Sequence, residues 1–561
     1  MEKRYDVAIL GGGLAGLTLS LQLKQAKPDI KIIVLERRDA AADQAAHKVG
    51  ESTVELGTYY LREVLNLKNY LDAKQLPKHG LRFFLSPHLR DQIHKRVELG
   101  PREFLPVPSH QVDRGSLEND MADMSKELGN EIVLGAKVTQ VDIDDELHTV
   151  AYAVDGQEAQ VQCRWAVDAT GRASLLKRKL GFAESIEHHV SSAWFRLDYK
   201  VDVDTWSDDP NWHSKVKTGL RHLSTIHLMG KGYWVWIIPL VGDRTSVGIV
   251  ADEKIHPLAS YNKLDKALAW INEHEPQFGE ELAKLTDKVL DFKIMKHFAH
   301  NSGETFSTDH WAVTGESGMF GDPFYSPGTD FISMSNTLVS DLILRDLADE
   351  DIFFRTKFYA QVFRSLYDNW MPLYVDQYQM WGNTQVMLTK ILWDWTAYWG
   401  INCMLFINDG LTDIPLMKSM IAGPKAMLNR YAELSMQMQH LFRDWTPSEN
   451  GEFSERYIDP FDLDFMRVLQ EDIVDKQADM EILKSKLLAN MDMLEVIAAE
   501  IFRMISNQVH GTSMDLEVDP YTMSLNKDRE LESKNSKLVA RDPYITKELG
   551  NMWLSPVEEI G

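Results

Sequence analysis

Three glycines near the start of the chain have the spacing of a phosphate-binding turn. Gly11, Gly13 and Gly16 form the pattern GxGxxG, with Ala15 inside it, between a short apolar run and a segment of helical periodicity. The first glycine permits a tight turn, the second lets a pyrophosphate approach the backbone, and the third lets helix and strand pack closely. The helix N-terminus then offers free N–H groups to phosphate. Any tight strand-to-helix turn would use the same spacing.

A carboxylate at the end of the next apolar run favours a dinucleotide. Glu36 lies twenty residues after Gly16, where its side chain can accept hydrogen bonds from ribose hydroxyls. A negative charge there also disfavours a 2′-phosphate. Together, the glycines and Glu36 predict a dinucleotide site at the N-terminal end of the chain.

The elements that position these residues indicate an α/β fold. YDVAILGGG and IKIIVLE are predicted buried strands on either side of a helix, which is a Rossmann-type unit. Further β signals, among them YWVWIIPL, predict an interleaved β-sheet substrate region, and the chain becomes helical from about residue 336. We expect a core over residues 1–345 with the sheet at about 185–300, a helical C-terminal cap over 346–510, and a polar tail over 511–561.

Composition excludes several classes of protein. The chain has 60 Lys and Arg against 84 Asp and Glu, a net charge of -24, which disfavours nucleic acid as a partner. Cys163 and Cys403 form no metal-like or disulfide-like pattern, so no metal is expected. No leader-like segment follows Met1, and the apolar stretch 395–407 is too short to cross a bilayer. These features predict a cytoplasmic protein without a membrane span.

Three downstream segments carry a first resemblance. AVDATGR (residues 166–172), WAVTGES (311–317) and HQVDRGSLENDM resemble segments of the FAD-binding monooxygenase superfamily. The resemblance implies FAD as cofactor, a Rossmann-type FAD-binding core, and cofactor-binding roles for Arg114, Asp168, Gly315 and Glu316. Members of the superfamily usually have aspartate where this chain has Glu316. No second glycine-rich fingerprint for NAD(P)H is present, which predicts a separate flavin reductase.

Three more motifs narrow the resemblance to the flavin-dependent halogenases, over roughly residues 5–345. These motifs are WxWxIP at Trp234 and Trp236, FxxPxxSxG within FGDPFYSPG, and KVGESTVE from Lys48. The resemblance implies that Trp234 and Trp236 shield the flavin. It further implies a flavin-side segment and a loop for halide and flavin: Gly50, Glu51 and Ser52, and Pro323, Ser326, Gly328 and Thr329.

Lys78 lies in a stretch similar to the one that carries the catalytic lysine of these halogenases, 28 positions after Gly50. The resemblance implies FADH2-dependent chlorination or bromination in secondary metabolism, with a channel that delivers hypohalous acid from the flavin to Lys78. The lysine would either hydrogen-bond the oxidant or form a haloamine. Tyr325 stands on the substrate side where tryptophan halogenases have glutamate, so an electron-rich phenol or pyrrole is expected, free or tethered to a carrier protein.

Alternatives remain at this point. The same flavin site would serve a monooxygenase or oxidase that uses no halide, or a flavoprotein partner without turnover. Pro327 has no N–H to offer a halide, although Gly328 and Thr329 do, and Asp330 would repel a halide if its carboxylate faced the flavin. The aromatic residues of the helical region, such as Trp370 and Trp395, are typical of core packing, and a hydrophobic substrate cleft is the other interpretation.

Overall fold

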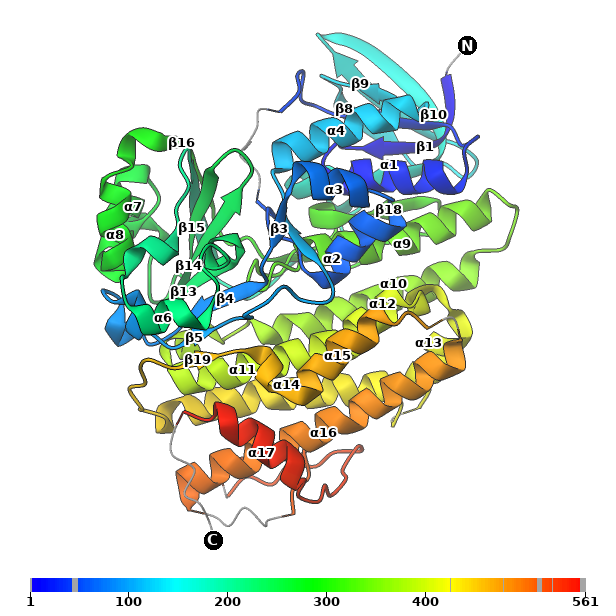
Figure 1. Ribbon diagram of the computed structural model, residues 1–561. Helices are drawn as coiled ribbons and strands as arrows, with labels where there is room; N and C mark the ends of the chain where they lie inside the picture. Colours follow the sequence, from blue (N-terminus) through cyan, green and yellow to red (C-terminus); the bar gives the residue numbers. More distant parts are fainter. Residues whose placement is uncertain are drawn as a thin grey trace.

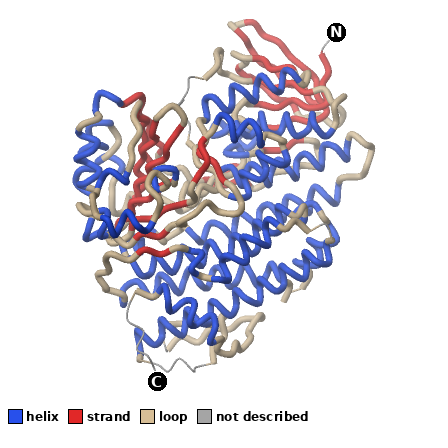
Figure 2. Tube along the Cα trace, in the orientation of Figure 1, coloured by secondary structure: helices blue, strands red, loops and turns tan. Residues whose placement is uncertain are grey.

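The computed structural model describes residues 3–42, 49–423, 425–477, 479–511, 517–526 and 528–554. Lys48, the first residue of the KVGESTVE motif, lies outside the described residues. Two β-sheets lie side by side, and a thick layer of helices packs beneath both of them (Figures 1 and 2). The α/β class expected from the sequence is confirmed.

The first sheet contains the N-terminal strand and has the order β7-β2-β1-β10-β9-β8, with β18 also paired to β10. β1 pairs in parallel with β2 and β10, and all of β2 and the last four residues of β1 and of β10 are buried. The strands of this sheet are β1 (Lys3–Leu10), β2 (Ile32–Leu35), β7 (Glu131–Val133), β8 (Lys137–Asp142), β9 (His148–Val154), β10 (Gln157–Asp168) and β18 (Trp311–Val313).

The glycine turn joins β1 to helix α1 (Leu14–Ala26). A Cβ atom at Gly16 would lie 2.0 Å from the Gly11 carbonyl oxygen, so only glycine lets the helix approach the strand this closely. Gly11 has φ +109°, which L side chains rarely adopt. The strand-turn-helix-strand unit therefore forms as its sequence predicts.

The second sheet extends beyond the range expected for it. Five of its strands lie within residues 190–295, but Leu81–Phe84, Glu98–Leu99 and Tyr457–Ile458 join the same sheet. Leu81–Phe84 joins the sheet because β4 pairs in parallel with β13. This pairing brings the segment just after Lys78 against the sheet. The strands are β4 (Leu81–Phe84), β5 (Glu98–Leu99), β12 (Val190–Leu197), β13 (Thr225–Gly230), β14 (Tyr233–Leu240), β15 (Arg244–Asp252), β16 (Val289–Met295) and β19 (Tyr457–Ile458).

Helices fill the space between and below the sheets. α2 (Glu55–Tyr59), α4 (Arg114–Glu127) and α9 (Gly328–Asp346) belong to the core, and α7 (Leu264–His274) and α8 (Pro276–Ala283) cover the second sheet (Figure 1). The lower layer consists of α10 (Phe353–Trp370), α11 (Thr384–Ala397), α12 (Met404–Ile407), α13 (Ile414–Ile421), α14 (Met427–Trp445), α15 (Asp464–Val474) and α16 (Met480–His510). A π-helical segment, Tyr398–Cys403, joins α11 to α12.

The region expected to be a polar tail contains a packed helix. α17 (Pro543–Met552) buries Ile545, Leu549 and Met552, and Trp553 stacks on Trp445 with ring centroids 5.3 Å apart. Its apolar residues follow a helical period that the charged residues between them obscured in the sequence. The segment closes the lower end of the helical layer.

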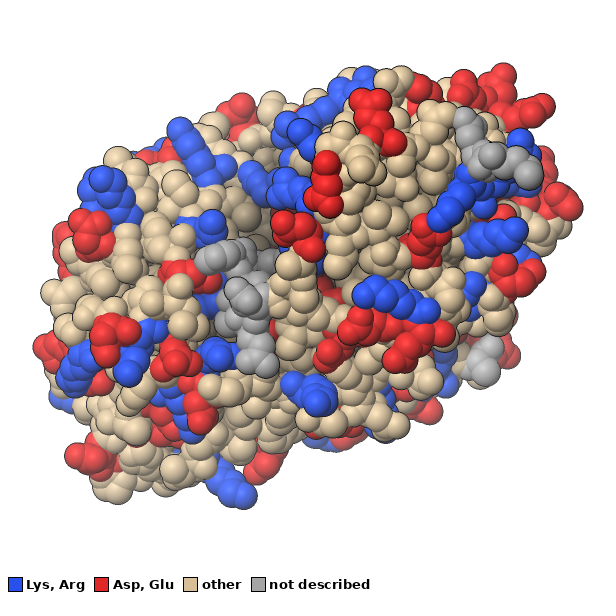
Figure 3. All heavy atoms as spheres, turned by 90° about the horizontal axis from the view of Figure 1, so that it is seen from above, with Lys and Arg blue, Asp and Glu red and all other residues tan. Residues whose placement is uncertain are grey.

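No helix in the described part of the chain has the length and apolar character that a bilayer crossing requires. On the face shown in Figure 3, the described acidic and basic side chains are interspersed. The net negative charge is therefore spread over this face together with basic residues.

Candidate active site

A cavity of about 780 Å³ lies between the two sheets and is lined by most of the residues predicted to hold a cofactor. It reaches from the glycine turn of α1 to the N-terminus of α9. Its volume falls in the range of ligand and cofactor pockets, ~300–1,000 Å³. The lining includes the predicted residues Gly11, Gly13, Ala15, Glu36, Gly50, Glu51, Ser52, Arg114, Trp234, Trp236, Gly315, Glu316, Pro323, Ser326, Gly328 and Thr329.

The glycine turn and Glu36 fit a dinucleotide cofactor. A Cβ atom built at Gly13 would meet no atom within 4 Å, so the backbone at the start of α1 is open to the cavity. The Glu36 carboxylate accepts hydrogen bonds from the Gly12 and Arg38 N–H groups at 2.7 and 2.9 Å, which fixes it at the cavity wall. The residues present therefore fit the phosphates and ribose of FAD.

Two predicted cofactor residues do not line the cavity. The Asp168 carboxylate accepts hydrogen bonds from the Thr170 and Leu176 N–H groups, at 2.9 and 2.7 Å. It thereby shapes the turn whose Ala169 and Thr170 do line the cavity. Gly16 acts through packing against Gly11, as its position in the motif predicts. Both residues stabilise backbone that lines the cavity without lining it themselves.

Buried charges surround the middle of the cavity. Arg114, at the start of α4, donates to the Val49 carbonyl at 2.6 Å and forms an ion pair with Glu118. The buried Glu51 carboxylate pairs with Arg196 at 2.9 Å. Burial raises the pKa of the Glu316 carboxyl, although Arg172 and Arg114 act to lower it. Each of these pairs rigidifies a segment that the cofactor would contact.

The two tryptophans of the WxWxIP motif form one wall. Trp234 and Trp236 lie on the same face of β14, with ring centroids 5.8 Å apart. The Trp236 ring lies against Gly248, where a Cβ atom would approach within 2.2 Å of it. Trp234 donates a hydrogen bond from its indole nitrogen to the Tyr378 hydroxyl at 3.3 Å. The sheet therefore presents two fixed aromatic rings to the cavity.

The FxxPxxSxG loop turns sharply before α9. Tyr325 and Ser326 both have positive φ, 71° and 61°, which turns the chain sharply at this point. Ser326 lines the flavin cavity, whereas Tyr325 lines a second cavity. The first N–H groups of α9, from Gly328 onward, have no acceptor within the helix and lie at the flavin cavity.

Lys78 is buried, with only 2% of its surface exposed. It ends strand β3 (Leu76–Lys78), which pairs with β6 (Ser109–Gln111). Its ammonium donates to the Ser52 hydroxyl at 2.8 Å and to the Thr53 carbonyl at 2.7 Å. The Ser326 hydroxyl lies 3.0 Å from the Ser52 hydroxyl, so a short polar chain runs from the flavin cavity to Lys78.

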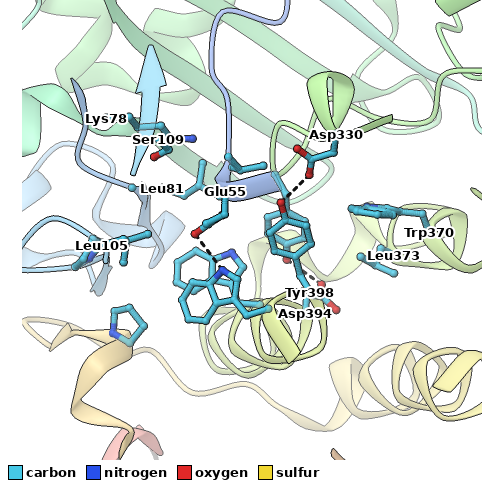
Figure 4. A pocket seen from close by; sticks show the side chains of 17 residues that line it. Glu55, Lys78, Leu81, Leu105, Ser109, Asp330, Trp370, Leu373, Asp394 and Tyr398 are labelled. Atoms are coloured by element: carbon cyan, nitrogen blue, oxygen red, sulfur yellow. Dashed lines mark hydrogen bonds between the residues drawn. The ribbon is translucent and has the colours of Figure 1, made fainter. Parts of the chain in front are cut away.

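Lys78 itself lines the second cavity, of about 50 Å³, shown in Figure 4. The linings of the two cavities share no residue, so the open channel expected from the resemblance is closed here. The closure has a clear cause, because Ser52, Ser326 and Lys78 are hydrogen-bonded in series across the wall. The wall is thin, since Thr329 and Asp330 are adjacent in the chain but line different cavities.

Two of the three carboxylates that line the second cavity, Glu55 and Asp330, act on the charge of Lys78. Glu55 accepts hydrogen bonds from the Trp399 indole at 3.0 Å and from Gln470 at 3.1 Å. Asp330 accepts from the Tyr398 hydroxyl and the Gly57 N–H, both at 2.8 Å. The Asp330 carboxylate therefore points away from the flavin cavity, and the repulsion of halide considered from the sequence does not arise.

Burial changes the ionisation of all three groups. It lowers the pKa of Lys78 to about 7, against the opposing effect of Glu55 and Asp330. It raises the pKa of Asp330 to about 7, although the Tyr398 and Gly57 hydrogen bonds lower it, and it also raises the pKa of Glu55. A neutral amine and a protonated carboxyl are thus both accessible near neutral pH.

Tyr325 belongs to a separate buried network in the same cavity. Its hydroxyl donates to Asp394 at 2.9 Å, and Asp394 also accepts from Lys390 at 2.6 Å and Gln439 at 2.8 Å. Burial raises the pKa of Tyr325 well above its usual value. With all three partners of Asp394 in place, this network forms a fixed wall of the cavity.

Glu55 and Asp394 were not predicted as site residues, and Tyr398 was considered only among the aromatic residues of a hydrophobic substrate cleft. Glu55 is the last residue of the KVGESTVE motif, which was the one available signal. The aromatic residues of the helical region divide between the two interpretations: Trp370, Trp395, Tyr398 and Trp399 line the cavity, whereas Trp381 and Trp393 are buried outside it. Among the described residues, no three His, Cys, Asp or Glu side chains gather as they would around a metal ion.

Comparison with known proteins agrees with this geometry. Residues 4–243 match the family model of an FAD binding domain. The flavin-dependent halogenase chlA of Dictyostelium discoideum is 25% identical over 500 residues, which cover 80% of this chain and 81% of that protein. A 1H-pyrrole-2-carbonyl-[peptidyl-carrier protein] brominase of Pseudoalteromonas luteoviolacea is 26% identical, over 64% of this chain and 81% of that protein.

Solved structures share the fold. Halogenase PltM, in complex with phloroglucinol and FAD, superposes with a TM-score of 0.61 at 16% identity and covers 88% of this chain and 96% of its own. The flavin-dependent brominase Bmp2 superposes with a TM-score of 0.52 at 22% identity, over 66% of this chain and 86% of its own. As expected from the sequence, the chain is an FAD-dependent oxidoreductase, and it is similar to flavin-dependent halogenases over most of its length.

Proposed function

We propose that the protein uses FADH2, O₂ and halide to chlorinate or brominate an electron-rich aromatic substrate, through hypohalous acid and Lys78. The observation that carries the proposal is the position of the Lys78 ammonium. It is buried on the wall between the flavin cavity and a small aromatic-lined cavity, hydrogen-bonded to Ser52 of the flavin side.

The flavin-side residues would bind the reactants and exclude water. Bound reduced FAD supplies the electrons with which O₂ and a halide ion become hypohalous acid and water. The free N–H groups of Gly328 and Thr329 at the start of α9 would hold the halide. Trp234 and Trp236 would shield the ring system, because both indoles are buried in the wall of the cavity.

Lys78 would bring the oxidant to the ring. Its hydrogen bonds to Ser52 and Thr53 place the nitrogen at the boundary, where it can receive hypohalous acid and orient the halogen toward one aromatic carbon. In the overall step the carbon–halogen bond forms, the halogen–oxygen bond breaks, and the ring proton leaves with hydroxide as water. A neutral amine also permits a haloamine, in which the halogen–nitrogen bond breaks instead.

Asp330 would activate a phenol. Its carboxylate faces the cavity near Lys78, and a pKa of about 7 suits a group that accepts the phenolic proton near neutral pH. This supplies a base where Tyr325 replaces the glutamate of the tryptophan halogenases. Pyrroles are electron-rich enough to react without one, and the related brominase acts on a pyrrole tethered to a carrier protein.

The delivery of reducing equivalents completes the proposal. We infer a separate flavin reductase, supported by the single glycine-rich fingerprint in the sequence, and a cytoplasmic location. A carrier-tethered substrate is supported by the related brominase and by a chlorinase named for the same pyrrole-carrier substrate.

The test reconstitutes the reaction with a generic flavin reductase, NADH, FAD and a panel of phenols and pyrroles. With bromide present, mass spectrometry should show product with the bromine isotope doublet. In halide-free buffer that product should be absent. An oxygenated product at the same rate with and without halide would instead identify a monooxygenase or oxidase, and bound flavin without any turnover would identify a non-catalytic partner.

A further inference from the structure

The cavity at Lys78 is too small by itself for an aromatic ring. Its volume is about 50 Å³, whereas a cavity of about 150 Å³ is known to accept benzene. A larger cavity, of about 410 Å³, lies next to it among the helices of the lower layer. The two linings share Trp370, Leu373, Asp394 and Tyr398, so these side chains form the partition between them.

The partition is held differently on its two sides. Asp394 has three side-chain partners, Tyr325, Lys390 and Gln439. The Tyr398 ring is held at its tip, where the hydroxyl donates to Asp330 and accepts from the Leu56 N–H, and the Trp370 indole donates to the Tyr374 hydroxyl. In Figure 4, Trp370 and Leu373 lie at the end of the small cavity opposite Leu105. A ring next to Lys78 therefore gains its space from the larger cavity.

The two cavities differ in the chemistry of their walls. The small cavity is aromatic, with Trp370, Trp395 and Trp399. The larger one is lined by a run of aliphatic side chains, Val362, Leu366, Ile401, Leu405, Met417 and Ile421, with the buried polar residues Asp394, Asn402 and Ser435 beside them. An aromatic chamber that leads into an aliphatic one matches a ring that carries an alkyl chain.

The rim of the larger cavity is polar. Its solvent-exposed lining residues are Gln361, Ser365, Asp368 and Asn429, from α10 and α14. Asp368 forms an ion pair with Arg364 at 3.2 Å. Among the described residues that line this cavity, none is a lysine or arginine, which a carrier-bound arm with its phosphodiester would be expected to meet at the rim.

We propose that the larger cavity is the binding site for an aliphatic chain on the substrate, which enters between α10 and α14 with its ring first. The inference deepens the proposed function, and it relies on that function for the reacting position of the ring. It assigns the helical region a role in substrate selection: phenols or pyrroles with a long alkyl or acyl chain are favoured over the bare rings.

The test measures binding and needs no turnover. Phenol, 4-butylphenol and 4-octylphenol are titrated calorimetrically into the FAD-loaded protein. Each methylene that enters the cavity should tighten the dissociation constant about fourfold, the equivalent of ~0.8 kcal/mol per buried CH₂. Equal affinity for the three phenols would overturn the inference, even if the protein halogenates them. Affinity that rises with chain length, in a protein that does not halogenate these phenols, would support the inference and contradict the proposed function.

Two variants test which cavity binds the alkyl chain of the ligand. Ala432→Trp fills the larger cavity from α14 and should abolish the chain-length dependence. Leu105→Trp fills the opposite end of the small cavity and should preserve the dependence. The reverse pattern would contradict the inference, because the chain would then leave past Leu105. Melting temperatures establish that both variants fold, and Ala432→Phe replaces the tryptophan variant if it does not.

A carrier-linked alternative is tested in the same titration. Pyrrole and phenol carboxamides of pantetheine are compared with alkylphenols of similar length. Tighter binding of the pantetheine amides, lost in Ala432→Trp, would identify the cavity as a carrier-arm site and overturn the aliphatic assignment. Tighter binding of the alkylphenols would support it.

Discussion

The flavin cavity and the cavity at Lys78 are neighbours built in different ways. The first is defined largely by backbone, with glycines at the start of α1 and a helix N-terminus at α9. The second is made of side chains from segments more than three hundred residues apart in sequence, such as Glu55 and Trp399. A backbone-defined site binds one cofactor in many proteins, whereas a side-chain-defined site can change its substrate without changing the fold.

Gly13→Val should weaken FAD binding in the flavin cavity and leave the cavity at Lys78 unchanged. We expect the largest effect from this variant. The added Cβ atom meets no protein atom within 4 Å, but the valine side chain fills the space beside the backbone where the pyrophosphate would lie. FAD binding, measured by fluorescence quenching, should weaken about 100-fold while the fold is kept. Gly550→Val, equally open but in α17, serves as control. Equal FAD affinity in Gly13→Val and wild type would contradict the cofactor site.

Asp330→Asn would alter the second cavity and leave the first intact. Halogenation of a phenol should fall about 30-fold, and the increase in kcat/KM that wild type shows as pH rises through about 7 should disappear. The amide keeps the size of the side chain, and FAD affinity should not change. Asp341→Asn, on the same helix but in neither cavity, is the matched control. An unchanged pH profile would remove Asp330 from the reaction.

A different kind of effect, on stability, should follow from the burial of Lys78. Unfolded Lys78 has the ordinary pKa of 10.5 and folded Lys78 about 7, so burial of the charged form destabilises the protein fully below pH 7. This penalty is relieved as pH rises from about 7 to 10.5. The free energy of unfolding, relative to Lys78→Met, should therefore increase over that window, as measured by denaturant titration at pH 7, 8.5 and 10. Parallel curves would show that the ammonium is not desolvated.

The same contrast explains how much the sequence predicted. Gly11, Gly13 and Glu36 act through backbone geometry and fixed spacing, so local sequence was enough to place them. Asp168 conforms to its motif but bonds its own turn, a distinction that depends on side-chain direction. The hydrogen bond from Tyr398 to Asp330 could not be predicted from the sequence, because only the packing of α11 and the π-helical segment against α9 brings the two side chains together.

The second sheet gives a parallel case. Its central strands were predicted from their β-rich sequence, but β4, β5 and β19 are too short to be recognised locally. They join the sheet through long-range pairing, and β4 thereby fixes the chain just after Lys78, while β3, which ends at Lys78, pairs with β6 in a separate two-stranded sheet. Helix α17 was not predicted for a related reason, because its apolar residues can be recognised as a buried face only from their packing against α16 and Trp445.

The most direct test of the account follows the halogen across the wall at Ser52 and Lys78. Wild type and Lys78→Met are supplied with equal reduced flavin and bromide, and both the brominated substrate and the hypobromous acid caught by a scavenger are measured. The account predicts equal total oxidised bromide, with nearly all of it on the substrate in wild type and nearly all in the scavenger in Lys78→Met. The same scavenger-resistant bromination in both proteins would contradict it.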